Sequence, residues 1–132
     1  VARFVGVETL VECRVLSSQG GVSVIEAGGQ TMEVAQAAMP GEQVRLCLRA
    51  EDVTLKTGSP PPGAVLPPNR LQGTVARLSP VGLHVRVSVD CGFPLTALVT
   101  HRAVEELGLG EGVKVTVQFK ATAPHLLLRS NP

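Results

Sequence analysis

Three short segments of this 132-residue chain combine a cation with hydroxyl or amide side chains. They are Lys120-Ala121-Thr122, Asn69-Arg70 and Thr100-His101-Arg102. This combination suits a tetrahedral dianion, because charge-assisted hydrogen bonds are about twice as strong as neutral ones. The segments are therefore candidates for an anion site. The alternative interpretation is that the cations are solvated and that the threonines serve turns or a helix cap.

The basic residues that could serve such a site gather in the second half of the chain. Residues 69–132 contain seven Lys or Arg against four Asp or Glu, a net charge of +3, whereas residues 1–58 contain five against seven, a net charge of −2. The whole chain carries +1 and has three Phe but neither Trp nor Tyr. It lacks the stacking aromatics and basic groove of a nucleic-acid-binding barrel, so we expect no nucleic-acid partner.

The residue types that most often catalyse reactions or bind metals are isolated in this sequence. No histidine has a cysteine or carboxylate at the spacing of a metal site or a triad, and no pair of cysteines has C-x-x-C spacing. We expect no catalytic residue, no metal and no cofactor, and therefore no enzyme activity. The cysteines are expected to be reduced, buried thiols. The six residues are His84, His101, His125, Cys13, Cys47 and Cys91.

The pattern of apolar residues predicts an all-β fold of short strands. Apolar and polar residues alternate strictly from Leu83 to Asp90, which indicates a strand with one buried and one wet face. Many short strands joined by glycine turns favour small closed barrels. The expected strands are Val11–Leu16, Val22–Ala27, Thr31–Ala35, Val44–Leu48, Leu71–Leu78, Leu83–Val89, Pro94–Val99, Val113–Phe119 and His125–Leu128.

The strands form two similar repeats separated by a proline-rich connector. Thr9–Val15 matches Asn69–Val75 in phase at an offset of 60, and Gly41–Ala50 matches Gly112–Ala121 at an offset of 71. The larger offset predicts an insertion at His101–Leu109, a short helix capped by Thr100 and ended by Gly108. The expected boundaries are 1-55 for the first repeat, 56-68 for an extended connector and 69-132 for the second repeat.

Several segments resemble the accessory domains of ABC import ATPases. Leu46–Leu55 is similar to the "iRpEdv.L" phrase that follows the nucleotide-binding domain of those proteins. Asn69–Val75 resembles the "N.l.G.V" opening of the TOBE and molybdate-binding (Mop) repeats. The remaining matches to a Mop repeat and to molybdate/tungstate importer subunits are Asp90–Thr100, Ala103–Leu109, Gly112 and Phe119–Thr122, and Val1–Gly6 resembles the hinge before this region.

The resemblance implies two tandem OB-like five-stranded barrels that form the C-terminal accessory domain of an oxyanion-importer ATPase. In such domains molybdate or tungstate is held between barrels, often from different subunits, and can inhibit import. Carried over to this sequence, the pattern points to Lys120 and Thr122, to the opening at Asn69 and Arg70, and to hydroxyls at Thr96 and Thr100 beside His101.

The same resemblance implies partners and a location. We expect a homodimer with a second copy, bound to a parent ATPase domain and to the membrane subunits of a transporter, at the cytoplasmic face of the membrane. The chain begins without Met, so we expect it to be a fragment. The alternative is a ligand-free dimerisation domain of an importer for sulfate, sugar, iron or polyamine. Two departures motivate it: Leu66-Pro67-Pro68 replaces the usual Ser-Ala-Arg, and Glu51 follows Arg49-Ala50.

Overall fold

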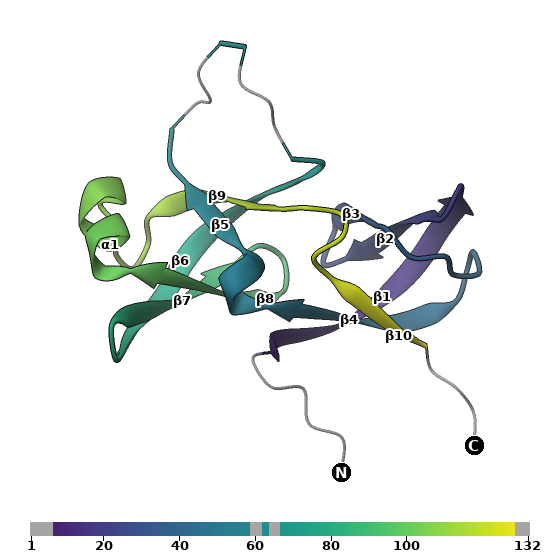
Figure 1. Cartoon of the computed structure of the whole chain (residues 1–132), viewed down its shortest axis with the longest axis horizontal. Helices are drawn as coiled ribbons and strands as arrows, with labels where there is room; N and C mark the ends of the chain where they lie inside the picture. The colour runs from purple at the N-terminus through teal and green to yellow at the C-terminus, as the bar shows by residue number, and fades with distance from the viewer. Residues whose placement is uncertain (1–6, 59–61, 64–66, 129–132) are drawn as a thin grey trace.

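The computed structural model describes residues 7–58, 62–63 and 67–128. These form two five-stranded antiparallel sheets that lie next to each other along the long axis of the molecule (Figure 1). The strand order is β10-β4-β1-β2-β3 in the first sheet and β5-β9-β6-β7-β8 in the second. The all-β prediction is confirmed. The expected hinge at Val1–Gly6 and residues 59–61 and 64–66 of the expected connector lie outside the described residues.

The observed strands follow the sequence pattern closely. Their bounds are β1 (Val7–Gln19), β2 (Val22–Ala27), β3 (Gln30–Val34), β4 (Gln43–Arg49), β5 (Thr54–Lys56), β6 (Asn69–Val81), β7 (His84–Asp90), β8 (Pro94–Thr100), β9 (Lys114–Phe119) and β10 (His125–Leu128). In β7, Val85, Val87 and Val89 are buried and alternate with more exposed polar residues, as the period of two requires. Only β5 was absent from the predicted strands, because three residues are too few to show a period.

The two halves of the chain repeat one another in structure. β1 pairs with β2 and β4, and β6 pairs with β7 and β9 in the same antiparallel arrangement. Each long first strand carries a register shift, between Val15 and Ser17 in β1 and between Val75 and Arg77 in β6. The two bulges are 60 residues apart, which is the offset that the sequence comparison predicts.

The fifth strand of each sheet comes from the other half of the chain. β5 follows β4 in sequence but pairs with β9, where Leu55 lies opposite Val117. β10 follows β9 but pairs with β4, where Leu126 lies opposite Leu46. The expected boundaries 1-55, 56-68 and 69-132 are therefore not the boundaries of the sheets. Alternation reveals a strand but not its partner, so the sequence pattern could not show this exchange.

The predicted helix is α1 (His101–Leu107). The Thr100 hydroxyl accepts a hydrogen bond from the Ala103 N–H at 3.0 Å and caps its first turn. Gly108 adopts a left-handed conformation at the other end, and its N–H donates to the Glu105 carbonyl. A second, shorter helix, η1 (Ala50–Asp52), turns the chain from β4 into β5.

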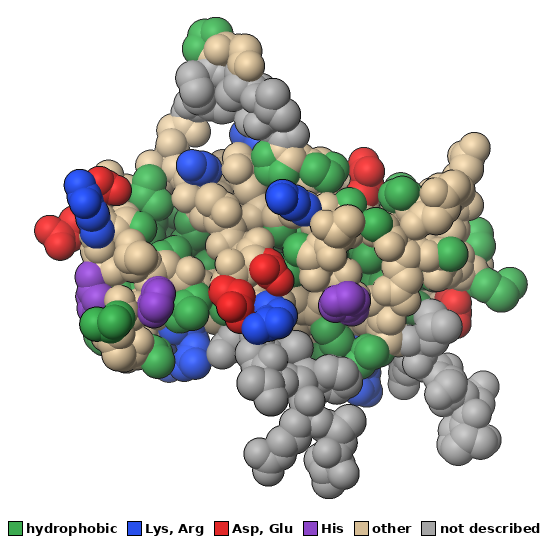
Figure 2. All heavy atoms as spheres, in the orientation of Figure 1, with side chains coloured by type: hydrophobic (Ala, Val, Ile, Leu, Met, Phe, Trp, Pro, Cys, Tyr) green, Lys and Arg blue, Asp and Glu red, His purple; other side chains and the backbone are tan. Residues whose placement is uncertain are grey.

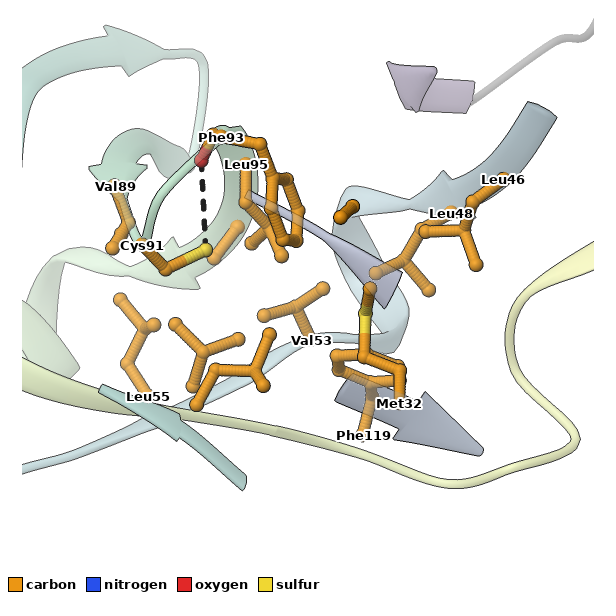
Figure 3. Close-up of a cluster of buried hydrophobic side chains, with 14 of the residues drawn as sticks. Met32, Leu46, Leu48, Val53, Leu55, Val89, Cys91, Phe93, Leu95 and Phe119 are labelled. Atoms are coloured by element: carbon orange, nitrogen blue, oxygen red, sulfur yellow. Dashed lines mark hydrogen bonds between the residues drawn. The ribbon is translucent and has the colours of Figure 1, made fainter. Parts of the chain in front are cut away.

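Buried side chains from both sheets form one continuous hydrophobic cluster. Figure 3 shows Phe93 and Phe119 within it, together with Met32 and leucines and valines of several strands. The chain contains few large aromatics, so two phenylalanines and a flexible methionine contribute much of the bulk where the halves meet. The halves therefore share a core, which neither half of the chain could complete alone.

The three cysteines are free and buried, as the sequence predicts, and Cys13 and Cys91 belong to this hydrophobic cluster. Burial raises the pKa of the Cys13 and Cys91 thiols to about 11, and it also raises the pKa of Cys47. The Cys91 thiol donates to the Phe93 carbonyl at 3.5 Å, as Figure 3 shows. Thiols with such raised pKa values are poor nucleophiles at neutral pH, so these residues serve as packing groups.

Two glycine turns touch where the halves meet. Gly28, between β2 and β3, and Gly92, between β7 and β8, both have positive φ angles. A Cβ atom on Gly92 would overlap the Gly28 carbonyl oxygen, and a Cβ atom on Gly28 would overlap the Gly92 carbonyl oxygen. Glycine is required at both positions, because only a residue without Cβ allows the two backbones to approach this closely.

We predict that Gly92→Ala destabilises the protein by about 2–5 kcal/mol, the sum of left-handed backbone strain and overpacking against Gly28. Gly21→Ala is the matched control, because Gly21 has a φ of +80° and a Cβ atom added to it would have no atom within 4 Å. It should cost only the backbone strain, about 1–2 kcal/mol. Chemical denaturation measures both values, and equal losses for the two variants would contradict a steric contact at Gly92.

Candidate anion-binding hollow

A hollow of about 830 Å³ lies where the two sheets exchange strands; we call it the central hollow. It is bounded by the ends of β4 and β9, by η1 and β5, and by the turn that leads into β10. Residues of both halves of the chain therefore line it. They are Arg49, Asp52, Thr54, Pro67, Pro68, Gln118, Phe119, Lys120, Thr122, Ala123 and His125.

The turn after β9 places two predicted site residues on this hollow. Lys120 and Thr122 both line it, and both side chains are exposed. The Ala123 N–H donates to the Lys120 carbonyl at 3.1 Å, which closes the turn, and the Ala35 N–H donates to the Ala121 carbonyl at 2.8 Å, which attaches the turn to the first sheet. These two hydrogen bonds fix the backbone of the turn, so Lys120 and Thr122 are held beside the same hollow. An ammonium and a hydroxyl placed in this way can both bind one anion.

Carboxylates also stand at the central hollow. Asp52 lines it, and the Arg49 guanidinium donates two hydrogen bonds to one Glu51 oxygen, at 2.7 and 3.1 Å. Both members of this ion pair are about half exposed, so the pair contributes little to stability. It does balance the Arg49 charge locally. Figure 2 shows acidic and basic side chains clustered over the segment between β4 and β5, with a histidine nearby.

Asn69 has a different environment from the one predicted. It is 1% exposed; its amide oxygen accepts from the Glu33 N–H at 2.7 Å, and its amide nitrogen donates to the Glu33 carbonyl at 2.8 Å. The side chain thereby pairs with the edge strand β3 as a neighbouring strand would. Thr9 aligns with Asn69 in the repeat and bonds to the edge strand of the other sheet, β8. Its hydroxyl accepts a hydrogen bond from the Thr96 N–H at 3.0 Å.

The remaining predicted residues do not line the central hollow. Arg70 is half-buried on β6 opposite Gln118, and its Nε is buried with no hydrogen-bond partner in the described part of the chain. Thr96 and Thr100 lie on β8, where the Thr100 hydroxyl caps α1. His101 begins α1, and its Nε2 lies 3.4 Å from the Gly82 carbonyl oxygen.

Sequence reasoning missed three polar residues of the central hollow. Thr54 and Gln118 face each other across the pairing of β5 with β9, and His125 begins β10. All three depend on the strand exchange, which no local pattern in the sequence signals. Among the described residues there is no group of three side chains that could hold a metal ion, and no helix long and apolar enough to cross a membrane.

The comparisons with known proteins agree with this architecture. Residues 67–126 match the TOBE domain family. A solved structure of the cytoplasmic molybdate-binding protein ModG, with molybdate bound, superposes with a TM-score of 0.81 at 25% identity, over 92% of this chain and 96% of that chain. The fold is therefore a tandem pair of OB-like Mop barrels.

Similar sequences indicate which group of TOBE-containing proteins this chain resembles. The chain is 32% identical over 93% of its length to the molybdate/tungstate import ATP-binding protein WtpC of Pyrococcus abyssi. It is 35% identical over 67% of its length to the molybdenum-pterin-binding protein MopA of Rhodobacter capsulatus, and 34% over 68% to the molybdenum import ATP-binding protein ModC of Bordetella parapertussis. It spans between a quarter and a third of these relatives, namely 33%, 33% and 25% of WtpC, MopA and ModC.

These findings assign the chain to a family. It is a TOBE/Mop-like domain, and it is of the kind related to the ATP-binding proteins of molybdate and tungstate import. The resemblance stated from the sequence is confirmed.

We predict that Asn69→Ala lowers the free energy of unfolding by about 1–3 kcal/mol, because it removes a buried amide and leaves both the Glu33 N–H and the Glu33 carbonyl without their partner. Asn69→Asp tests the geometry further, since a carboxylate can accept from the Glu33 N–H but cannot donate to the Glu33 carbonyl. Urea denaturation measures both variants. A stability loss below about 0.5 kcal/mol for Asn69→Ala, typical of an ordinary surface position, would show that Asn69 has no structural role.

Proposed function

We propose that this chain binds a tetrahedral oxyanion, molybdate or tungstate, in the central hollow. The observation that carries the proposal is the presence of Lys120 and Thr122 on one hollow that both halves of the chain line. The similarity to molybdate-bound ModG and to molybdate/tungstate import proteins supports the identity of the anion. Thr54 and Gln118 add further hydrogen-bonding groups to the same hollow.

We further propose a place for the chain in a larger assembly. It acts as a C-terminal regulatory and oligomerisation domain of an importer ATPase, at the cytoplasmic face of the membrane, and not as an enzyme itself. The similarity to ATP-binding proteins of molybdate and tungstate import supports this place in an assembly. An anion bound there would favour one arrangement of the two ATPase subunits over another and so inhibit import.

A ligand-free dimerisation domain is the second candidate. Asp52 at the central hollow and the engagement of Asn69 with Glu33 favour it, because both remove attraction for an anion. Calorimetric titration of the 132-residue chain with molybdate, tungstate and sulfate separates the two functions. Heats of binding for molybdate or tungstate support the first. A dimer by sedimentation with no heat for any of the three anions supports the second.

Lys120→Ala is expected to weaken molybdate binding by about 10- to 100-fold, because it removes a charge-assisted hydrogen bond worth about 1.5–3 kcal/mol. Thr122→Val should cost less, since it removes a neutral donor. Lys114→Ala is the matched control: Lys114 is also an exposed lysine of the second half, at the other end of β9, and does not line the central hollow. Unchanged affinity in Lys120→Ala would place the site elsewhere.

The regulatory role predicts that rising molybdate lowers the ATPase turnover of the intact transporter, and that Lys120→Ala shifts the inhibition to higher concentrations. The reason is that inhibition requires the same anion contact as binding. Turnover is measured in reconstituted transporter over a molybdate series. Turnover that stays flat while the isolated chain binds molybdate would refute regulation without refuting binding.

A further inference from the structure

The charged groups at the central hollow cancel one another. Lys120, Arg49 and Asp52 line the hollow and sum to one positive charge, and Glu51, which does not line it but is bonded to Arg49, brings the formal sum of the four residues to zero. Arg49 is bonded directly to Glu51 and cannot turn fully toward a ligand without losing that pair. A dianion that enters this hollow therefore meets no net positive charge from these four residues, although it needs compensation when it leaves water.

His125 can supply the missing charge. It begins β10, is exposed, and lines the central hollow with Lys120 and Asp52. No side-chain hydrogen bond joins its imidazole to any other residue that the structure describes, so the ring is available to a ligand. Imidazole is the side chain whose charge ordinarily changes between about pH 5 and 8.

We infer that His125 takes up a proton when a tetrahedral dianion enters the central hollow, so that the anion binds more tightly as pH falls. This inference rests on the proposed function and adds the proton dependence of its site. The reaction is a proton transfer in which an N–H bond forms at an imidazole nitrogen as the bond to hydrogen in a hydronium ion or buffer acid breaks, with no change of oxidation state. A nearby dianion favours the charged form of a base, and by linkage the charged form favours the dianion to the same extent.

The other groups around His125 leave this dependence to the imidazole. On β4, the neighbours are Cys47, which is the cross-strand partner of His125, and the diagonal residues Arg49 and Arg45, of which Arg45 is ion-paired with Glu12 of β1. η1 contributes Glu51 and Asp52, and the turn before β10 contributes Lys120. Burial raises the pKa of the Cys47 thiol, which keeps it neutral. Carboxylates, lysine and arginine ordinarily keep their charges across the neutral range, so among these groups the imidazole is the one that responds.

The chain offers internal controls for this role. His84 and His101 are also exposed histidines, but neither lines the central hollow. His84 lies at the start of β7 and His101 at the start of α1. A titration that affected binding only through the overall charge of the protein would involve all three histidines, whereas a local role belongs to His125 alone.

The test is calorimetric titration of the 132-residue chain with dilute molybdate, a dianion throughout this range, at about pH 6 and about pH 8. Two buffers of different protonation enthalpy are used at each pH, so that the heat reports proton uptake directly. For the unaltered chain we expect binding about tenfold tighter at the lower pH, the effect of one added charge worth about 1.4 kcal/mol. Proton uptake should accompany binding.

The variants separate the explanations. His125→Gln should bind with nearly the same affinity at both pH values and without proton uptake, while His84→Gln behaves like the unaltered chain. His125→Lys should bind tightly at both, because it carries the charge permanently. If His125→Gln keeps the full pH dependence, the inference is wrong and the proposed anion site survives. If the unaltered chain binds no molybdate at either pH, the proposed function and the inference both fail.

Discussion

The reciprocal exchange of fifth strands is the constraint on which the rest of this structure depends. β5 completes the second sheet and β10 completes the first, although each follows the opposite sheet in sequence. The exchanged strands each bury a leucine, Leu55 of β5 and Leu126 of β10. The exchange therefore joins the hydrophobic cores of the two halves as well as their backbones. Separating the halves would expose both apolar surfaces and two unpaired strand edges, each of which is costly in water.

The polar contacts between the halves follow from the same symmetry. Asn69 bonds to the edge strand β3, and Thr9, its counterpart in the first half, bonds to the edge strand β8. Gly28 and Gly92 meet in the same reciprocal manner. The two sides are alike in position but not in chemistry: asparagine forms two hydrogen bonds where threonine forms one. Repeats that diverge in this way keep the shape of their interface while each half becomes free to acquire its own site.

The sequence predicted local structure well and long-range pairing poorly, for a physical reason. Alternation and capping rules depend only on neighbouring residues. They are therefore enough to predict the buried valines of β7 and both ends of α1, at Thr100 and Gly108. The placement of β5 and β10 depends on contacts some 60 to 80 residues away, which no local rule contains. The same limit applies to the central hollow: Lys120 and Thr122 share one short turn and could be predicted together, whereas Thr54 and Gln118 meet only through the pairing of β5 with β9.

The exchange also has a consequence for the order in which a newly made chain can acquire its structure. The first sheet is complete only when β10 pairs with β4, with Leu126 opposite Leu46. Most of the chain must therefore leave the ribosome before that sheet is complete. Until then, β4 presents an unpaired edge and an open apolar face, a state in which nascent domains associate wrongly with one another. Pairings this distant in sequence also slow folding. The edge and apolar face of β4 thus stay exposed for much of synthesis before the compact fold is complete. The hollow that the strand exchange creates is among the last features to form.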